Sequence, residues 1–243
     1  MNAKIGPVVL DTAIALILLI VMISGCISPG CILGSGNLKS ENRTTSSFSS
    51  IELLGIGDLY VFQGSQSLRI EAEDNILPVL KSDVTGDMLV ISTSECVTPR
   101  KSIKIYASSP EIKGLYSSGS GNIISLSPIH TDSMDLGMSG SGGINLGVDC
   151  KDLRTSVSGS GNVLLRGNAT NSSVNISGSG NMRGYDLATK RSAITISGSG
   201  QAEVNAEDEL DVRISGSGGI HYTGSPSKMN QHISGSGSLT KTS

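Results

Sequence analysis

The chain has 243 residues, a formal net charge of −3 and a sequence pI near 5.6. This slight acidity argues against a nucleic-acid partner, which would require clustered Lys and Arg. Only 37% of the residues are apolar, aromatic residues make up 3% and there is no Trp, so a thick aromatic core is not expected. The four cysteines, Cys26, Cys31, Cys96 and Cys150, are too few for a disulfide-based scaffold.

Residues 1–25 are predicted to be an export signal of the lipoprotein type. Lys4 precedes an almost wholly apolar run from Thr12 to Ile23, which is too short for a spanning helix of roughly 20 residues. The run ends at Ile23-Ser24-Gly25-Cys26, which resembles a lipobox, so Cys26 is the expected site of lipid attachment. The alternatives are an uncleaved anchor and a conventional signal peptide, and each also places the rest of the chain outside the cytoplasmic membrane.

Residues 26–47 are rich in Ser, Gly and Asn and show neither helical nor strand periodicity. We therefore expect them to form a flexible tether. With Cys26 lipidated, Cys31, Cys96 and Cys150 leave an odd number of thiols. A bridge between Cys96 and Cys150 is the pairing considered for an oxidising compartment, although sequence does not reveal which cysteines are close together.

Residues 118–243 form a repeat array. The sequence Ser-Gly-Ser-Gly occurs seven times, at intervals of 21, 19, 19, 20, 18 and 19 residues. Self-similarity at this period predicts a solenoid. The glycines assigned to its turns are Gly119, Gly121, Gly140, Gly142, Gly159, Gly161, Gly178, Gly180, Gly198, Gly200, Gly216, Gly218, Gly235 and Gly237.

Apolar and polar residues alternate on both sides of each motif. The residue before the motif is apolar in six copies (Met138, Val157, Ile176, Ile196, Ile214 and Ile233). This period of two predicts a strand entering and a strand leaving each corner. The motif glycines either face inward where the coil is pinched or supply a positive φ in a tight turn, and both alternatives make the motif structural.

The predicted fold class is all-β, a parallel β-helix-like flattened solenoid with coils of about 19 residues that turn at the Ser-Gly-Ser-Gly corners. Stacked coils rise about 4.8 Å each, and their inward side chains form a narrow apolar core. Residues 48–117 are β-rich but less regular. They include a predicted hairpin at Thr85-Gly86-Asp87 and a degenerate corner at Gly55-Ile56-Gly57-Asp58. We interpret them as the cap and opening coils of the same solenoid, with a separate small β-domain as the alternative.

Sites for metals and cofactors find no support in the sequence. The dinucleotide fingerprint and the Walker-type phosphate loop are both absent. His130, His221 and His232 fall at different repeat positions, so stacking would not bring them together as metal ligands. No metal and no cofactor is therefore expected.

Four acidic residues are the nearest candidates for catalysis of the kind used by β-helix enzymes that cleave polysaccharides. They are Asp132, Asp135, Asp149 and Asp152. Arg154 occupies the position of Asp135 in the next coil, which indicates a surface ion pair of small energetic weight. No catalytic residue is therefore assigned.

Three segments resemble the head-GIN domain family, which is described as autotransporter-adhesin-like. They are Ile51-Glu52-Leu53-Leu54-Gly55-Ile56-Gly57-Asp58-Leu59, Glu73-Asp74-Asn75-Ile76-Leu77-Pro78 and Gly86-Asp87-Met88-Leu89-Val90-Ile91. The Ser-Gly-Ser-Gly-Asn copies are similar to the recurring motif of that family, and the resemblance covers roughly Phe48 to Thr240. It implies a β-helix-like fold in which the glycine motif turns the chain between two sheets. It also implies a role in cell-surface adhesion, with no catalytic residues.

The sequence thus predicts an extracytoplasmic, lipid-anchored β-solenoid that acts as an adhesion or binding module and not as an enzyme. Its expected partners are the membrane, through lipid on Cys26, and a glycan or a cell-envelope protein, and self-association is left open. Ser160, Ser179 and Ser199 are the candidate binding ladder, because stacked hydroxyls would repeat at the coil spacing. The alternatives are a passive envelope scaffold and, less favoured, a polysaccharide-acting enzyme.

Overall fold

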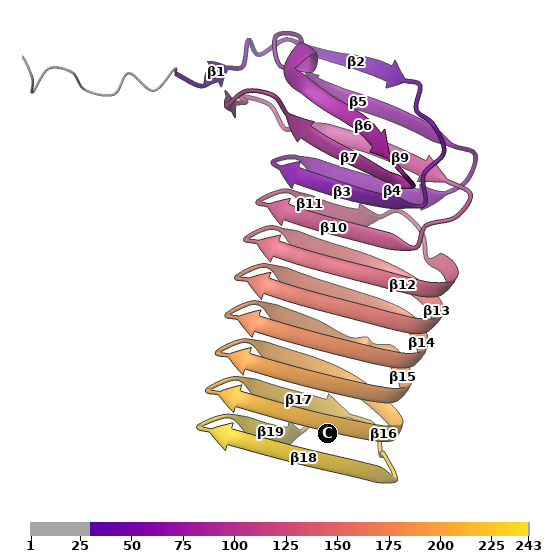
Figure 1. Cartoon of the computed structure of the whole chain (residues 1–243), viewed down its shortest axis with the longest axis vertical. Coiled ribbons are helices and arrows are strands. Elements are labelled where there is room, and N and C mark those ends of the chain that lie inside the picture. Colours follow the sequence, from indigo (N-terminus) through magenta and orange to yellow (C-terminus); the bar gives the residue numbers. More distant parts are fainter. Residues whose placement is uncertain (1–29, 243) are drawn as a thin grey trace, which may run out of the picture.

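The computed structural model describes residues 30–242, which form a flattened β-solenoid with a β-rich cap at its N-terminal end (Figure 1). Cys26 and the predicted signal segment lie outside the described residues. Within residues 30–242, no helix is long and apolar enough to cross a membrane. The predicted fold class is confirmed.

The strands form two groups along the chain. The cap and opening coil contain β1 (Ile32–Leu33), β2 (Leu38–Arg43), β3 (Ser50–Gly55), β4 (Asp58–Gln63), β5 (Ser67–Glu73), β6 (Leu80–Thr85), β7 (Met88–Thr93), β8 (Val97–Thr98) and β9 (Lys104–Ser109), with a 3-10 turn at Leu77–Val79. The later coils contain β10 (Gly114–Gly119), β11 (Asn122–Ser125), β12 (Ile129–Gly140), β13 (Gly143–Gly159), β14 (Asn162–Gly178), β15 (Asn181–Gly198), β16 (Gln201–Gly216), β17 (Gly219–Thr223), β18 (Lys228–Gly235) and β19 (Ser238–Lys241).

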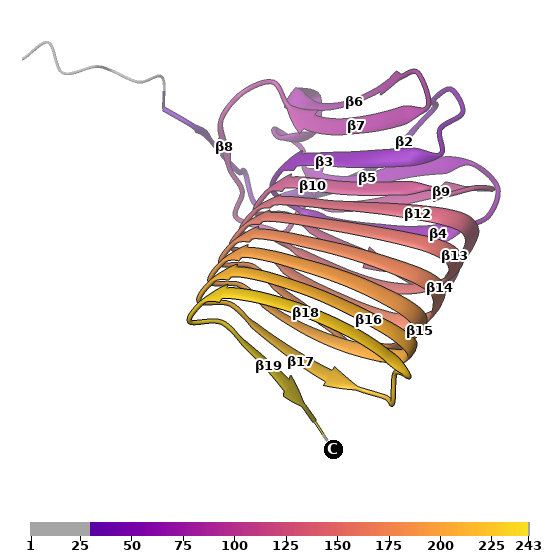
Figure 2. The same cartoon turned by 60° about the horizontal axis from the view of Figure 1, so that its bottom comes forward.

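Each of the strands β13 to β16 forms one coil by running from one corner to the next and bending midway (Figure 2). Its first half belongs to one face of the solenoid and its second half to the other. We call these the outgoing face and the returning face. Neighbouring coils pair in parallel with the corners in register, as in Gly159↔Gly178↔Gly198. Register shifts between Gly184 and Ala188 place the extra residues of β15 away from the corners.

The core is a narrow aliphatic layer between the two faces. Val157, Ile176 and Ile196 are no more than 1% exposed, whereas their sequence neighbours face outward. Because the strands pair in parallel and in register, each inward position stacks on the same position of the next coil. The interior is therefore filled by columns of aliphatic side chains. Thr155 lies in this layer, and its hydroxyl has no hydrogen-bond partner.

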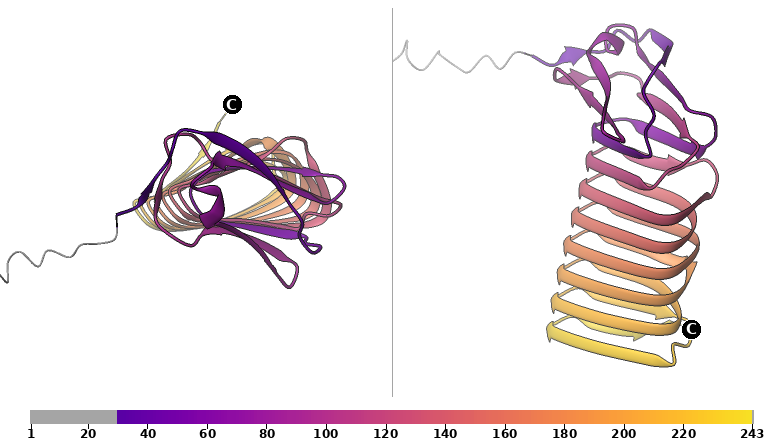
Figure 3. Two further views of the ribbon diagram at one scale, coloured as in Figure 1. Left: turned by 90° about the horizontal axis from the view of Figure 1, so that it is seen from above. Right: turned by 45° about the vertical axis from the view of Figure 1, so that its right-hand side comes forward.

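The cap continues the solenoid rather than forming a separate domain. Gly55 pairs with Gly119, and Asp58 pairs with Asn122, so the predicted degenerate corner is confirmed. Beyond this opening coil, β7 extends the returning face and β9 extends the outgoing face. The predicted hairpin between β6 and β7 is also confirmed. The cap strands cover the N-terminal end of the solenoid, as seen from above in Figure 3.

The expectation of a flexible tether is wrong for residues 30–47. There, β1 pairs in parallel with β8, and β2 pairs antiparallel with β5. Almost all side chains of β2 are exposed, so strand-to-strand hydrogen bonds and not an apolar face hold it. A strand at a sheet edge that buries no side chains has no apolar alternation, and the sequence therefore carries no strand signal here.

Candidate functional site

The two glycines of each Ser-Gly-Ser-Gly corner meet different requirements. The first glycine of every copy has a positive φ, between 107° at Gly235 and 153° at Gly119, which side chains other than hydrogen strongly disfavour. The second glycine packs against the preceding coil. At Gly200, a Cβ atom would lie 2.5 Å from the Gly180 carbonyl oxygen and 2.6 Å from Ile176 Cγ2. The sequence left two roles open for the motif glycines. The first glycine supplies the positive φ, and the second faces inward where the coil is pinched.

Backbone hydrogen bonds link each corner to the one before it. The Ser199 N–H donates to the Gly178 carbonyl oxygen at 2.9 Å, and the Gln201 N–H donates to the Gly180 carbonyl oxygen at 3.3 Å. The equivalent bond of the second serine recurs at the other corners, at 2.8 to 2.9 Å. A bulkier residue at either glycine would therefore separate hydrogen-bonded coils, so the corner is a structural device.

The candidate ladder of Ser160, Ser179 and Ser199 lies on the outer edge of the corners. All three side chains are exposed. Within the described residues, none of the three hydroxyls makes a hydrogen bond to another group of the chain. The ladder presents free hydroxyls at the coil spacing on an exposed edge of the solenoid.

The four candidate acids are each engaged by a neighbouring coil. Asp132 bonds to Lys151 at 2.8 Å, and this contact lowers the pKa of Asp132. Asp135 and Arg154 form the predicted ion pair at 3.6 Å, with the Arg154 side chain largely exposed and that of Asp135 partly exposed. The other two, Asp149 and Asp152, accept amide hydrogen bonds from the next coil at 2.8 and 2.9 Å. Each of the four carboxylates is thus occupied by a cation or an amide of the adjacent coil.

The histidines remain apart, as their repeat positions predict. His130 pairs in register with Asp149, and its Nδ1 lies 3.4 Å from that carboxylate. His221 and His232 lie on opposite faces of the solenoid. Across residues 30–242, no three His, Cys, Asp or Glu side chains converge as a metal site would require.

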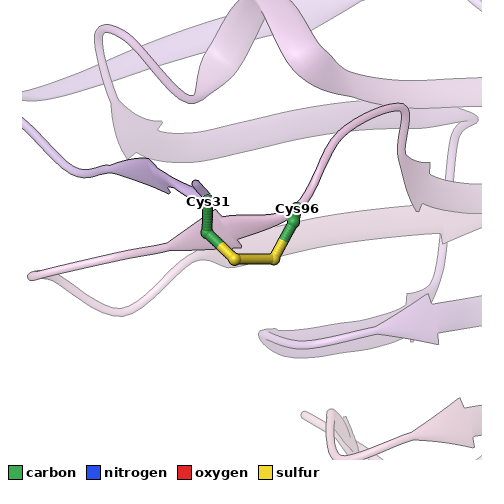
Figure 4. The surroundings of a disulfide bond; sticks show 2 residues. All are labelled: Cys31 and Cys96. Atoms are coloured by element: carbon green, nitrogen blue, oxygen red, sulfur yellow. A yellow bond between two sulfur atoms is a disulfide. The ribbon is translucent and has the colours of Figure 1, made fainter. Parts of the chain in front are cut away.

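The disulfide joins Cys31 to Cys96 (Figure 4). The considered Cys96–Cys150 pairing is therefore wrong. The parallel pairing of β1 with β8 places the two bonded cysteines side by side, with Cα atoms 4.6 Å apart. Cys150 lies on β13 as a half-buried free thiol. Burial, and then the nearby carboxylates of Asp152 and Asp149, raise its pKa to about 11, so it is a poor nucleophile at neutral pH.

Glu73 fastens the N-terminal segment to the cap. Its side chain is fully buried. The carboxylate accepts hydrogen bonds from the backbone N–H groups of Gly36 at 2.6 Å and Arg100 at 2.9 Å. Burial works to raise the pKa of this carboxyl, but these donors, the Lys101 N–H and the charge of Arg100 outweigh it, so the pKa is lowered.

The two residues after Glu73 extend this contact. Ser35 donates its hydroxyl to Asp74 at 2.5 Å, and its N–H donates to the Asn75 side-chain oxygen at 2.9 Å. Asn75 also donates to the Leu33 carbonyl oxygen at 2.8 Å. We call the contacts of Glu73, Asp74 and Asn75 with the N-terminal segment the clamp. The sequence analysis did not predict it. Its one signal was the polar triplet Glu73-Asp74-Asn75 in a segment already singled out by the family resemblance.

Known structures share this architecture. A crystal structure of a putative adhesin from Bacteroides fragilis has 26% identity and a TM-score of 0.82, covering 87% of this chain and 100% of its own. A Parabacteroides distasonis structure, named a putative lipid binding protein, has 27% identity and a TM-score of 0.73, covering 88% and 100%. A putative adhesin from Parabacteroides merdae, at 22% identity and a TM-score of 0.65 over 87% and 99%, shares the fold.

A family model matches most of the chain. No curated protein matches the chain. The model described as "putative auto-transporter adhesin, head GIN domain" matches residues 47–226, which include the opening coil and most of the solenoid. The disulfide agrees with the extracytoplasmic location that such a family suggests, because disulfides persist in oxidising compartments. The chain therefore belongs to the head GIN domain family that this model describes.

Proposed function

We propose that this protein is a surface adhesin without catalytic activity, held to a membrane at its capped end by lipid on Cys26. The observation that carries the proposal is the attachment of the N-terminal segment to the cap through the Cys31–Cys96 disulfide. Only five peptide bonds separate Cys26 from Cys31. At about 3.3–3.6 Å per residue, they span at most about 18 Å, so a lipid on Cys26 would keep the cap close to the membrane surface.

The solenoid would then extend away from that membrane. Its seven corner copies, at about 4.8 Å per coil, correspond to about 33 Å of stacked sheet. Every coil is tied to its neighbours by backbone hydrogen bonds and a continuous core, which makes the solenoid a stiff support. The bonded state of the candidate acids supports binding rather than catalysis.

The anchor is tested by substituting the cysteine that would carry it. In cells fed a labelled fatty acid, the parent protein should take up the label and fractionate with membranes. Cys26→Ala should lose the label and leave the precursor unprocessed. Cys31→Ala is the matched control and should keep the label, because it removes only the disulfide. A lipid-free mature form of the parent protein, seen by intact-mass analysis, would contradict the anchor.

Adhesion is tested on whole cells. Cells that display the parent protein should attach to immobilised glycans or envelope proteins more than cells that lack it. A hydrolysis assay on the same glycans should release no reducing ends. Attachment that does not depend on the protein would contradict the adhesin proposal, and release of reducing ends would instead indicate a polysaccharide-acting enzyme.

A further inference from the structure

An apolar strip crosses the outgoing face of the coils nearest the cap. The register places Tyr106 beside Tyr60, and Tyr60 beside Ile124. Leu164 stands two coils further along the same column, after Asn145. We call Tyr106, Tyr60, Ile124 and Leu164 the outgoing strip. Strands of this face lie behind the returning strands in Figure 1.

These four side chains point outward. In β4, Leu59 and Val61 are fully buried and Tyr60 lies between them, partly exposed. In β11, Ile123 is buried and Ile124 is partly exposed. Further along the column the residues are polar, namely Arg183, Glu203, His221 and Thr240. The apolar outward side chains are thus confined to one end of the column, and clustered exposed apolar groups mark interaction sites.

The aromatic part of the strip is held in a fixed position. The rings of Tyr60 and Tyr106 are stacked, with centroids 5.1 Å apart and planes 16° from parallel. The Arg69 guanidinium lies 4.2 Å from the centroid of the Tyr106 ring. In a chain with 3% aromatic residues, two rings are placed outside the core, where burial does not account for them. Tyr60 and Arg69 come from the strands on either side of β9, so they flank the Tyr106 ring and hold the pair of rings at the partly exposed surface.

A hollow adjoins the strip where the residue after the corner is Gly143. Asn122 and Asn162 occupy this position in the coils on either side. A hollow of about 420 Å³ opens at Gly143, and Ile124, Leu164 and Arg183 also line it. Asn122 Oδ1 projects over Gly143, where it would lie 3.0 Å from a Cβ atom.

The two asparagines offer complementary groups to this hollow. The Asn122 Nδ2 donates to Asp58 at 2.8 Å, which leaves Asn122 Oδ1 as an acceptor. Asn162 Oδ1 accepts from Asn181 at 3.2 Å, which leaves Asn162 Nδ2 as a donor. A group that both donates and accepts hydrogen bonds, such as a hydroxyl, therefore fits between them.

We propose that the outgoing strip and the Gly143 hollow form a binding site for a glycan. This inference rests on the proposed adhesin function and names its ligand class. A sugar ring has an apolar C–H face, which suits the strip, and hydroxyls at its edge, which suit the two amides. The strip crosses the coils at about 4.8 Å per coil, so a linear chain of sugars can lie along it.

An extended peptide is a poorer match for this surface. Peptides that add a strand need an unpaired sheet edge. At the strip, β4 pairs with β9 and β11, and β11 pairs with β4 and β13, so both strands are occupied on both sides. The amides at the hollow are uncharged, and the nearby Asp58 is bonded to Asn122. Arg183 also lines the hollow with an exposed side chain, so a sugar that carries a carboxylate fits the hollow as well as a neutral one.

The test places an Asn side chain at position 143, where the neighbouring coils have Asn122 and Asn162. Gly143→Asn inserts the residue that stands in the neighbouring coils, so the fold should tolerate it, and its side chain would occupy the part of the hollow between Asn122 and Asn162. Gly219→Asn is the matched control. It makes the same change in the same column but far from the strip, at a glycine where a Cβ would approach no atom closer than 3.6 Å. Leu164→Ser removes an apolar contact on the outer face.

Binding is measured by calorimetry on the purified full chain in detergent, with neutral gluco-, xylo- and chito-oligosaccharides and with acidic oligogalacturonides. At least one series should bind the parent. Gly143→Asn should lose about tenfold or more in affinity, Leu164→Ser should weaken binding, and Gly219→Asn should leave it unchanged. Equal affinities for Gly143→Asn and the parent, or binding to none of the oligosaccharides, would overturn the site.

The cell attachment assay separates this failure from failure of the adhesin function. If cells displaying Gly143→Asn attached as well as cells displaying the parent protein, the adhesin function would stand, but its ligand would bind at another site. A protein or peptide that competes for the strip would replace the glycan as its ligand class. Cells that attach no better than those lacking the protein would contradict the adhesin function itself.

Discussion

The corner glycines allow backbone strain and steric overlap to be measured separately. Gly198 has a φ of 136°, and a Cβ there would lie 2.5 Å from the Gly178 carbonyl oxygen. Gly55, the equivalent residue of the opening coil, has a φ of 110° but meets no atom within 4 Å of its Cβ. Gly200 lacks a positive φ, and its Cβ would overlap the preceding coil. Alanine at Gly198 therefore imposes both backbone strain and steric overlap. Alanine at Gly55 imposes strain alone, and alanine at Gly200 imposes overlap alone.

The magnitudes follow from these geometries. A non-glycine residue in a disfavoured backbone region costs about 1–3 kcal/mol, so Gly55→Ala should lower the free energy of unfolding by about that amount. Overpacking a rigid interior costs about 1–3 kcal/mol, which applies to Gly200→Ala. Gly198→Ala incurs both and should cost about 2–6 kcal/mol. The exposed side chain of Ser199 lies between Gly198 and Gly200. The free energy of unfolding of Ser199→Ala should stay within about 0.5 kcal/mol of that of the parent.

Urea denaturation of the parent and the four variants, followed by circular dichroism, measures these differences. The expected order of destabilisation is Gly198→Ala first, Gly55→Ala and Gly200→Ala next, and Ser199→Ala last. If Gly198→Ala were no less stable than Ser199→Ala, the glycines would not be present for backbone or packing reasons. If it merely matched Gly55→Ala, the predicted clash between coils would be refuted while the strain argument stood.

Three further predictions concern the core and the cap. Ile196→Asp should cost several kcal/mol, because it buries an unpaired carboxylate, whereas Thr195→Asp on the outer face should cost little; equal shifts in melting temperature would refute the alternation. Thr155→Val removes a buried hydroxyl without a partner and should raise the free energy of unfolding by about 1 kcal/mol; an unchanged or lower denaturation midpoint counts against this. The lowered pKa of Glu73 means that its carboxylate stabilises the fold above its ordinary pKa of 4.5, and that this stability is lost as the pH falls below that value. Glu73→Gln should flatten that acid dependence in melting curves taken across pH, and an unchanged pH profile would speak against the clamp.

The repeat sequence by itself determined the solenoid. The Ser-Gly-Ser-Gly spacing placed the corners, and the alternation of apolar residues around them, as at Ile176 and Ile196, distinguished the inward from the outward side. Both signals are local, and each coil pairs with a copy of itself, so the register follows once the corners are aligned. The degenerate corner at Gly55 was recognisable for the same reason.

Features that depend on contacts between distant, non-repeating segments were decided only by the tertiary structure. The Cys31–Cys96 bond joins residues 65 positions apart, and it depends on how the N-terminal segment crosses the cap. The fixed conformation of residues 30–47 depends on the pairing of β2 with β5 and on hydrogen bonds to the buried carboxylate of Glu73. Tyr60 and Tyr106 come together because β9 returns beside β4 after the cap strands have intervened. No repeat spacing encodes these contacts, since their geometry exists only once the cap has folded against the first coil.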